Sequence, residues 1–138
     1  MVGRIGNLAG AALIATATAG SAVAASDDPL AAHLWTSRVL VIAAPEADDA
    51  RLRAQREALA SARGGVKERD LVVIEAVGSG KQAAALRQRL GLSEGAFRAV
   101  LVGKDGGPKL SSAEPIPPQT LFATIDAMPM RRDEMKRR

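Results

Sequence analysis

The sequence contains no cysteine and no tyrosine, and it has one histidine, one tryptophan and two phenylalanines among 138 residues. Without cysteine there can be no disulfide, no redox dithiol and no peroxide-reducing thiolate, so stability must come from packing. A single histidine excludes metal sites that are built from several imidazoles. The scarcity of aromatic rings removes the stacking platforms with which proteins bind single-stranded nucleic acid.

The formal net charge of +4 does not indicate a nucleic-acid partner, because the excess positive charge lies at the ends of the chain. Arg4 lies near the start, and the last eight residues, RRDEMKRR, hold five basic and two acidic side chains. With these set aside, residues 25–130 hold 13 of the 19 basic residues and 13 of the 15 acidic residues. We therefore expect no nucleic-acid binding, and we expect the basic tail to be a solvated, partly frayed end.

The first 24 residues have the layout of a secretory signal peptide. Arg4 is followed by an uncharged stretch rich in alanine, leucine and isoleucine, and then by small residues spaced as in Ala22-Val23-Ala24. We expect cleavage after Ala24, one domain over 25–138, and a periplasmic or secreted location. The leader is too weakly apolar to act as an anchor and no later stretch reaches spanning length, so we expect no integral membrane segment after cleavage.

The rest of the chain alternates strand-like and helix-like segments. Apolar runs bounded by turn residues predict strands, and good helix formers between capping residues and glycines predict helices. We expect strands at 37–45, 69–77, 96–103 and 108–112. We expect helices at 49–63 and at 79–92, the second with a C-cap at Gly91. A last helix should run from Pro117 or Pro118 to Met128, where Pro129 ends or kinks it. The order β-α-β-α-β-β-α predicts a thioredoxin-like α/β fold, in which helices flank a central mixed sheet.

Four segments carry a family resemblance: HLWTSRVLVIAAP, KERDLVV, FRAVLVGKDGGPKL and LFATIDAMPMRRDEM. Through their GKDGGxK and DxMPMR motifs, residues 29–135 resemble an uncharacterised bacterial domain family that is often exported. That family is related to the C-terminal domain of vertebrate sushi-repeat extracellular proteins. The resemblance implies a thioredoxin-like or peroxiredoxin-like fold whose biochemical function is not established.

The positions that hold the redox cysteines and the nearby proline of thioredoxin-fold enzymes hold other residues in this chain. Their dithiol follows the first central strand, where this sequence reads Pro45-Glu46-Ala47-Asp48-Asp49. Their proline before the third strand is replaced by Gly95-Ala96. A fold can persist without the chemistry of its relatives, so we expect no catalytic residue of that kind and no cofactor.

The loop Gly103-Lys104-Asp105-Gly106-Gly107 raises the question of a phosphate site. Phosphate-binding glycine loops precede a helix whose N-terminus faces the anion, whereas this loop precedes Pro108 and a strand-like KLSS. Asp-Gly between two extended runs instead predicts a tight hairpin turn, whose two central residues tolerate positive φ. A turn does not require the flanking Lys104 and Lys109, so these remain candidate contact residues.

Other groups have both a structural and a functional interpretation. The acidic residues of 46–49 form either a helix cap or a carboxylate site, and capping is favoured because a helix N-terminus stabilises their charged form. His33 fits a half-buried histidine better than a member of a hydrolase triad. The methionines at 128, 130 and 135 fit gap-filling in the core better than a Cu(I) site. We therefore predict no metal centre.

Arg38 and Trp35 lie at positions shared with the family. A Trp35–Arg38 stack, or an ion pair of Arg38 with Asp70 or Asp126, would be a structural device. The alternative is an Arg38 that faces a ligand.

These observations leave two classes of function. The leading hypothesis is a non-catalytic module that binds an unknown protein or a small anionic ligand. The alternative is an anion-binding protein or enzyme whose site lies around the 103–109 hairpin. An anion site requires a concave pocket where basic groups converge, whereas an interaction module requires an apolar surface with its lysines in solvent. The candidate contact residues for either class are Arg38, Lys104, Asp105, Lys109 and Arg131.

Overall fold

The structure is a computed structural model that describes residues 28–137. The predicted signal peptide lies outside the described residues. The elements, in chain order, are η1 (Ala31–His33), β1 (Arg38–Ala44), α2 (Ala50–Ala60), α3 (Arg63–Glu68), β2 (Leu71–Val77), α4 (Lys81–Leu90), β3 (Arg98–Val102), β4 (Pro108–Ser112), α5 (Pro118–Asp126) and α6 (Pro129–Lys136).

The four strands form one mixed sheet in the order β2-β1-β3-β4. β1 pairs in parallel with β2 and antiparallel with β3, and β4 continues from β3 as an antiparallel hairpin. β1 is central, and all seven of its residues are buried. β2 lies at an edge, where its single charged residue, Glu75, pairs with Arg56 of α2. The predicted α/β fold of thioredoxin-like architecture is confirmed.

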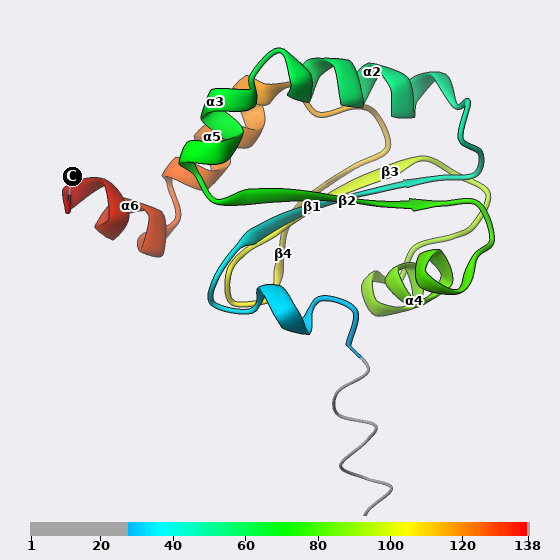
Figure 1. Cartoon of the computed structure of the whole chain (residues 1–138), viewed down its shortest axis with the longest axis horizontal. Coiled ribbons are helices and arrows are strands. Elements are labelled where there is room, and N and C mark those ends of the chain that lie inside the picture. The colour runs from blue at the N-terminus through cyan, green and yellow to red at the C-terminus, as the bar shows by residue number, and fades with distance from the viewer. Residues whose placement is uncertain (1–27, 138) are drawn as a thin grey trace, which may run out of the picture.

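Helices cover both faces of the sheet. Figure 1 shows α2, α3 and α5 on one face, η1 and α4 on the other, and α6 projecting from one end of the molecule. Because side chains alternate along a strand, β1 contributes to two cores. Leu40 and Ile42 pack towards α2 and α5, whereas Val39 and Val41 pack towards α4.

The helix predicted over 49–63 is two helices. Asp49 is the N-cap of α2 as expected, because its Oδ1 accepts bonds from the backbone N–H groups of residues 51 and 52. α2 ends at Ala60, however, and α3 runs through the two glycines that were expected to stop the helix. At Gly65 a Cβ would lie 2.6 Å from the Phe122 ring, so this glycine allows α5 to pack closely. Gly65 therefore serves packing between helices, whereas a Cβ at Gly64 would meet no atom within 4 Å.

Residues 131–136 of the basic tail are helical instead of partly frayed, which corrects the sequence expectation, although most of their side chains are exposed to solvent as expected. α5 ends at Asp126, and Pro129 occupies the first turn of a further helix, α6. A proline suits that position because the N–H it lacks would have no partner within the helix. Among residues 28–137, no helix is both long and apolar enough to cross a membrane.

Candidate functional site

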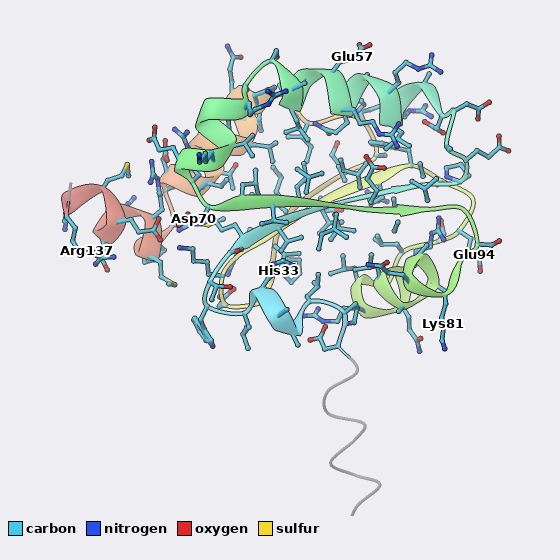
Figure 2. All side chains as sticks on the ribbon, in the orientation of Figure 1. His33, Glu57, Asp70, Lys81, Glu94 and Arg137 are labelled. Atoms are coloured by element: carbon cyan, nitrogen blue, oxygen red, sulfur yellow. The ribbon has the colours of Figure 1, made fainter. Side chains whose placement is uncertain are left out.

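A network of charged side chains connects α6 to the sheet. Glu134 of α6 accepts two hydrogen bonds from the Arg38 guanidinium, at 3.2 and 3.1 Å, and one from Lys104 Nζ at 2.9 Å. Lys104 Nζ also donates to Asp70 Oδ2 at 3.0 Å. Figure 2 shows Asp70 at the end of the molecule from which α6 projects. These contacts join β1, the start of β2, the hairpin and α6 at one place.

A second cluster lies beside the first. Arg131 of α6 donates to Asp126 Oδ1 at 3.0 Å and to Glu68 Oε2 at 2.8 Å. Asp126 also accepts a bidentate pair of bonds from Arg69. Asp126 therefore pairs with Arg69 and Arg131, and the predicted pairing of Arg38 with Asp70 or Asp126 is wrong. Within the described residues, the cation–π contact is formed by Arg69 over Phe122 instead of by Arg38 and Trp35.

The basic partners keep these carboxylates charged. Burial would raise the pKa of Glu134, but hydrogen bonds from Arg38 and Lys104 together outweigh burial and hold its pKa below the usual range. The pKa of Asp126 is lowered chiefly by the hydrogen bond from Arg69, with a further contribution from Arg131. Each carboxylate is thus matched to cations from other elements, and the network has no surplus negative charge.

A cavity of about 540 Å³ opens next to this network. Four of the five predicted contact residues line it, namely Arg38, Lys104, Asp105 and Lys109. Arg131 is not among the lining residues; its side chain is 1 % exposed and pairs with Asp126 and Glu68. The strand register explains the convergence: Val39 pairs with Val102, so the residues next to them, Arg38 and Gly103, lie side by side at the cavity.

The remaining wall of the cavity is mainly apolar. Trp35 comes from the segment before β1, and the others come from the end of α5 and the start of α6. Trp35 is 60 % exposed and Met130 is 39 % exposed, so both present apolar surface to solvent. The apolar lining residues are Trp35, Ala127, Met128, Pro129 and Met130.

Two residues beside the cavity have left-handed backbones. Trp35 has φ 66° and Asp70 has φ 50°, and they are the non-glycine residues of 28–137 with positive φ. For a bulky residue such as tryptophan this conformation is an outlier that costs of order 1–3 kcal/mol. Both are held by the same residue, since Trp35 N–H donates to the Lys104 carbonyl at 2.6 Å and Asp70 accepts from Lys104 Nζ. Such strain persists only where the surrounding structure imposes it.

The glycine-rich loop is a hairpin turn, as predicted, and it leads into β4. Its geometry differs from the expected two-residue turn, because within the loop positive φ occurs only at Gly106. The Asp105 side chain accepts a bond from Gly107 N–H at 3.0 Å, and Gly103 N–H donates to the Gly107 carbonyl at 2.9 Å. The loop is therefore closed by its own hydrogen bonds.

The hairpin contains a bulge at Lys109. Leu101 pairs with Leu110 and Val102 pairs with Pro108, so Lys109 is the extra residue of β4. Bulges redirect side chains and are frequent beside functional sites. Here Lys109 packs over Gly103, where a Cβ would lie 2.7 Å from Lys109 Cε, and its Nζ reaches Asp105 Oδ2 at 2.9 Å.

The other sequence candidates have structural surroundings. No three His, Cys, Asp or Glu side chains of residues 28–137 are grouped so that they could hold a metal ion. His33 is half-buried in η1, as expected. Met128 packs against the core, but the expectation that all three methionines fill core gaps is wrong, because Met130 and Met135 are exposed.

Sequence reasoning missed Glu134 altogether and treated Trp35 only as a stacking partner. Glu134 lies three residues after Arg131, which places both on one side of α6, and this spacing was an available signal. The left-handed conformation of Trp35 has no signal in the sequence, because that conformation favours glycine or asparagine.

Comparisons with known proteins place the chain in a family without assigning an activity. No curated protein matches it. A family model described as a domain of unknown function, DUF4174, matches residues 29–134. This match spans most of the chain and nearly all of the described residues, including every residue that lines the cavity. The chain therefore belongs to the DUF4174 family.

Proposed function

We propose that this protein is an exported, non-catalytic binding module and that the cavity between the β3–β4 hairpin and the α5–α6 junction binds an apolar group of its ligand. The observation that carries the proposal is Trp35, a large aromatic side chain that is 60 % exposed beside the cavity on a strained backbone. Burial of an aromatic side chain contributes more to binding than burial of most other residues. Export rests on the layout of the first 24 residues.

The cavity suits binding better than catalysis. Arg38 and Lys104 are already engaged by Glu134, and the Thr124 hydroxyl donates to the Thr120 carbonyl of its own helix. Acid–base and nucleophilic catalysis require a nucleophile or proton carrier that can reach the substrate, together with a base that activates it. The cavity lining in the described part of the chain contains neither histidine nor cysteine. Its exposed lysine–carboxylate pair, Lys109 with Asp105, is a poor base, because the hydrogen bond from Lys109 lowers the pKa of Asp105. The cavity volume of about 540 Å³ is within the range of small-molecule sites.

The alternative of an anion site or enzyme built from several converging basic residues has less support. It required several basic groups to face a ligand, but Arg131 lies outside the cavity and Arg38 is 1 % exposed and bound to Glu134. Lys104 is 9 % exposed and shared between Asp70 and Glu134. A phosphate would therefore have to displace internal carboxylates in order to bind these cations.

The test uses Trp35 as a built-in reporter, because the chain has one tryptophan and no tyrosine. Titration with the uncharged dye N-phenyl-1-naphthylamine should quench Trp35 fluorescence saturably, by energy transfer to dye in the cavity. Ala127→Arg places a bulky cation in the apolar wall and should abolish saturable quenching. The matched control is Ala123→Arg, which changes an exposed alanine within α5 that does not line the cavity. Non-saturable quenching, or equal effects of the two variants, would refute the proposal.

A further inference from the structure

We propose that the ligand is a small amphipathic carboxylate, whose apolar body lies against Trp35 and Met130 and whose carboxylate binds Lys109 Nζ. This inference rests on the proposed binding function and adds the chemical class of the ligand. It follows from the charge of the cavity wall, from the exposure of one particular cation, and from the way the hairpin positions that cation.

The charged wall of the cavity has an excess of positive charge. Arg38, Lys104 and Lys109 line it together with one acid, Asp105. The carboxylates that balance Arg38 and Lys104 belong to Glu134 and Asp70, and these two residues are not among the lining residues. Arg38 and Lys104 are nearly buried and paired, so the cation that a ligand in the cavity meets is Lys109, beside the apolar wall. Charge complementarity favours an anion with an apolar portion over a neutral or cationic ligand.

Lys109 is the lining cation that a ligand can reach. Its side chain is 35 % exposed, compared with 9 % for Lys104 and 1 % for Arg38. Its ammonium group has three donors, and Asp105 Oδ2 accepts one of them at 2.9 Å. Asp105 is 45 % exposed, and exposed ion pairs of this kind are weak. A ligand carboxylate can therefore bind Lys109 Nζ without displacing Asp105.

The hairpin aims Lys109 at the cavity. Leu110 faces the core beneath α5, so regular alternation along β4 would turn Lys109 to the opposite face of the sheet. The bulge instead brings Lys109 among the residues that line the cavity, and Gly103 leaves room for its stem. Neither the bulge nor the glycine is required for a simple connection between β3 and β4, but together they determine where Nζ lies.

The same geometry favours a single negative charge. One accessible ammonium adjacent to the Asp105 carboxylate suits a monoanion, whereas a phosphate dianion would be repelled more strongly by Asp105 and would lack the several donors that dianion sites present. The carboxylate could belong to a free carboxylic acid or to the C-terminus of a peptide with an apolar last residue. The chemistry at Lys109 is the same in both cases.

The test compares decanoate with decanol, which share an apolar chain and differ in charge. Each compound is added to the protein below its aggregation concentration, and binding is followed by Trp35 fluorescence. Decanoate should bind about tenfold more tightly, the effect expected of one charge-assisted hydrogen bond. Lys109→Met should remove that difference and leave decanol binding unchanged. Gly103→Ala keeps the charge but forces Lys109 Cε away, so it should reduce the preference for decanoate in part. Lys81→Met is the control, because this exposed lysine of α4 does not line the cavity and lies at the other end of the molecule from Asp70 (Figure 2).

The outcomes separate this inference from the proposed function. If neither compound changes Trp35 fluorescence while the neutral dye binds, the ligand class is wrong and the binding cavity stands. If the dye does not bind either, the proposed function fails. Equal affinities for decanoate and decanol, or equal losses of both in Lys109→Met, would overturn the role of Lys109. N-acetyl-dileucine and its C-terminal amide distinguish a free carboxylic acid from a peptide C-terminus as the natural ligand. If the peptide acid binds more tightly than decanoate and the amide does not bind, the ligand is a peptide C-terminus.

Discussion

Glu134 is the residue whose replacement should reveal how α6 is attached. The substitution Glu134→Gln keeps the size of the side chain and one carbonyl oxygen, but it removes the negative charge that Arg38 and Lys104 share. Lys104 retains Asp70, and Arg38 retains its bond to the Arg69 carbonyl at 2.9 Å. The main loss therefore falls on Arg38, which is 1 % exposed and would lose its only carboxylate among the described residues.

The magnitude follows from burial. Removing one partner of a fully buried ion pair costs about 3–5 kcal/mol, and losing a hydrogen bond to a charged group costs about 1.5–3 kcal/mol. Glu134 is 15 % exposed and glutamine keeps one acceptor, so we expect a loss of about 2–3 kcal/mol. For a domain of this size that loss lowers Tm by about 8–12 °C if α6 unfolds together with the sheet.

The assay is urea unfolding followed by circular dichroism, combined with amide hydrogen exchange of α6. Apart from Arg131, no residue of the described part of α6 is buried, so the helix can also detach locally, and faster exchange there would report this. The control is Glu75→Gln, which removes the charge from the exposed pair with Arg56 and should have little effect. If Glu134→Gln changes neither stability nor α6 exchange more than Glu75→Gln does, the network does not hold α6.

Two further predictions concern stability. The folded-state pKa values of Asp126 and Glu134 lie below their ordinary values of 3.8 and 4.5. The unfolded chain therefore binds more protons in acid than the folded protein does. The midpoint of urea unfolding should for this reason fall as the pH drops below about 5. A midpoint that stays constant from pH 7 to pH 3 would contradict this. Gln55→Leu should lower the free energy of unfolding by roughly 1–3 kcal/mol for each orphaned backbone group, since Gln55 bonds both the N–H and the carbonyl of Ile116. The control is Gln88→Leu, which changes an exposed glutamine. Equal unfolding free energies of the two variants would show that the reasoning is wrong.

The sheet was predictable because its strands are marked by local patterns. The run SRVLVIAAP is apolar from Val39 to Ala44, and in the structure β1 is buried on both faces between its two neighbours. Gly91 was correctly expected to be a left-handed cap and has φ 69°. The glycines of α3 misled the prediction because a glycine can end a helix or, as at Gly65, allow another helix to pack closely. Only the position of Phe122 in α5 decides between these roles.

The candidate site was predictable in part. The hairpin lysines were found because a turn does not need them, and Arg38 because of its place in a shared motif. The charge network was not found, because Arg38 and Glu134 are 96 positions apart and a basic tail looks like solvated sequence. An ion pair between distant segments leaves no periodic signal, and its energy depends on burial that only the fold determines.

The Glu75–Arg56 pair has a consequence beyond folding stability. β2, with the sequence LVVIEAV, has one charged residue and lies at the edge of the sheet, where Val73 is 36 % exposed. An apolar edge strand is a template on which another chain can add a strand, and a charge in its middle opposes such pairing. We therefore expect Glu75 to oppose aggregation of the folded protein through this edge. A residue that contributes little to the free energy of unfolding can in this way determine the concentration at which the protein remains soluble.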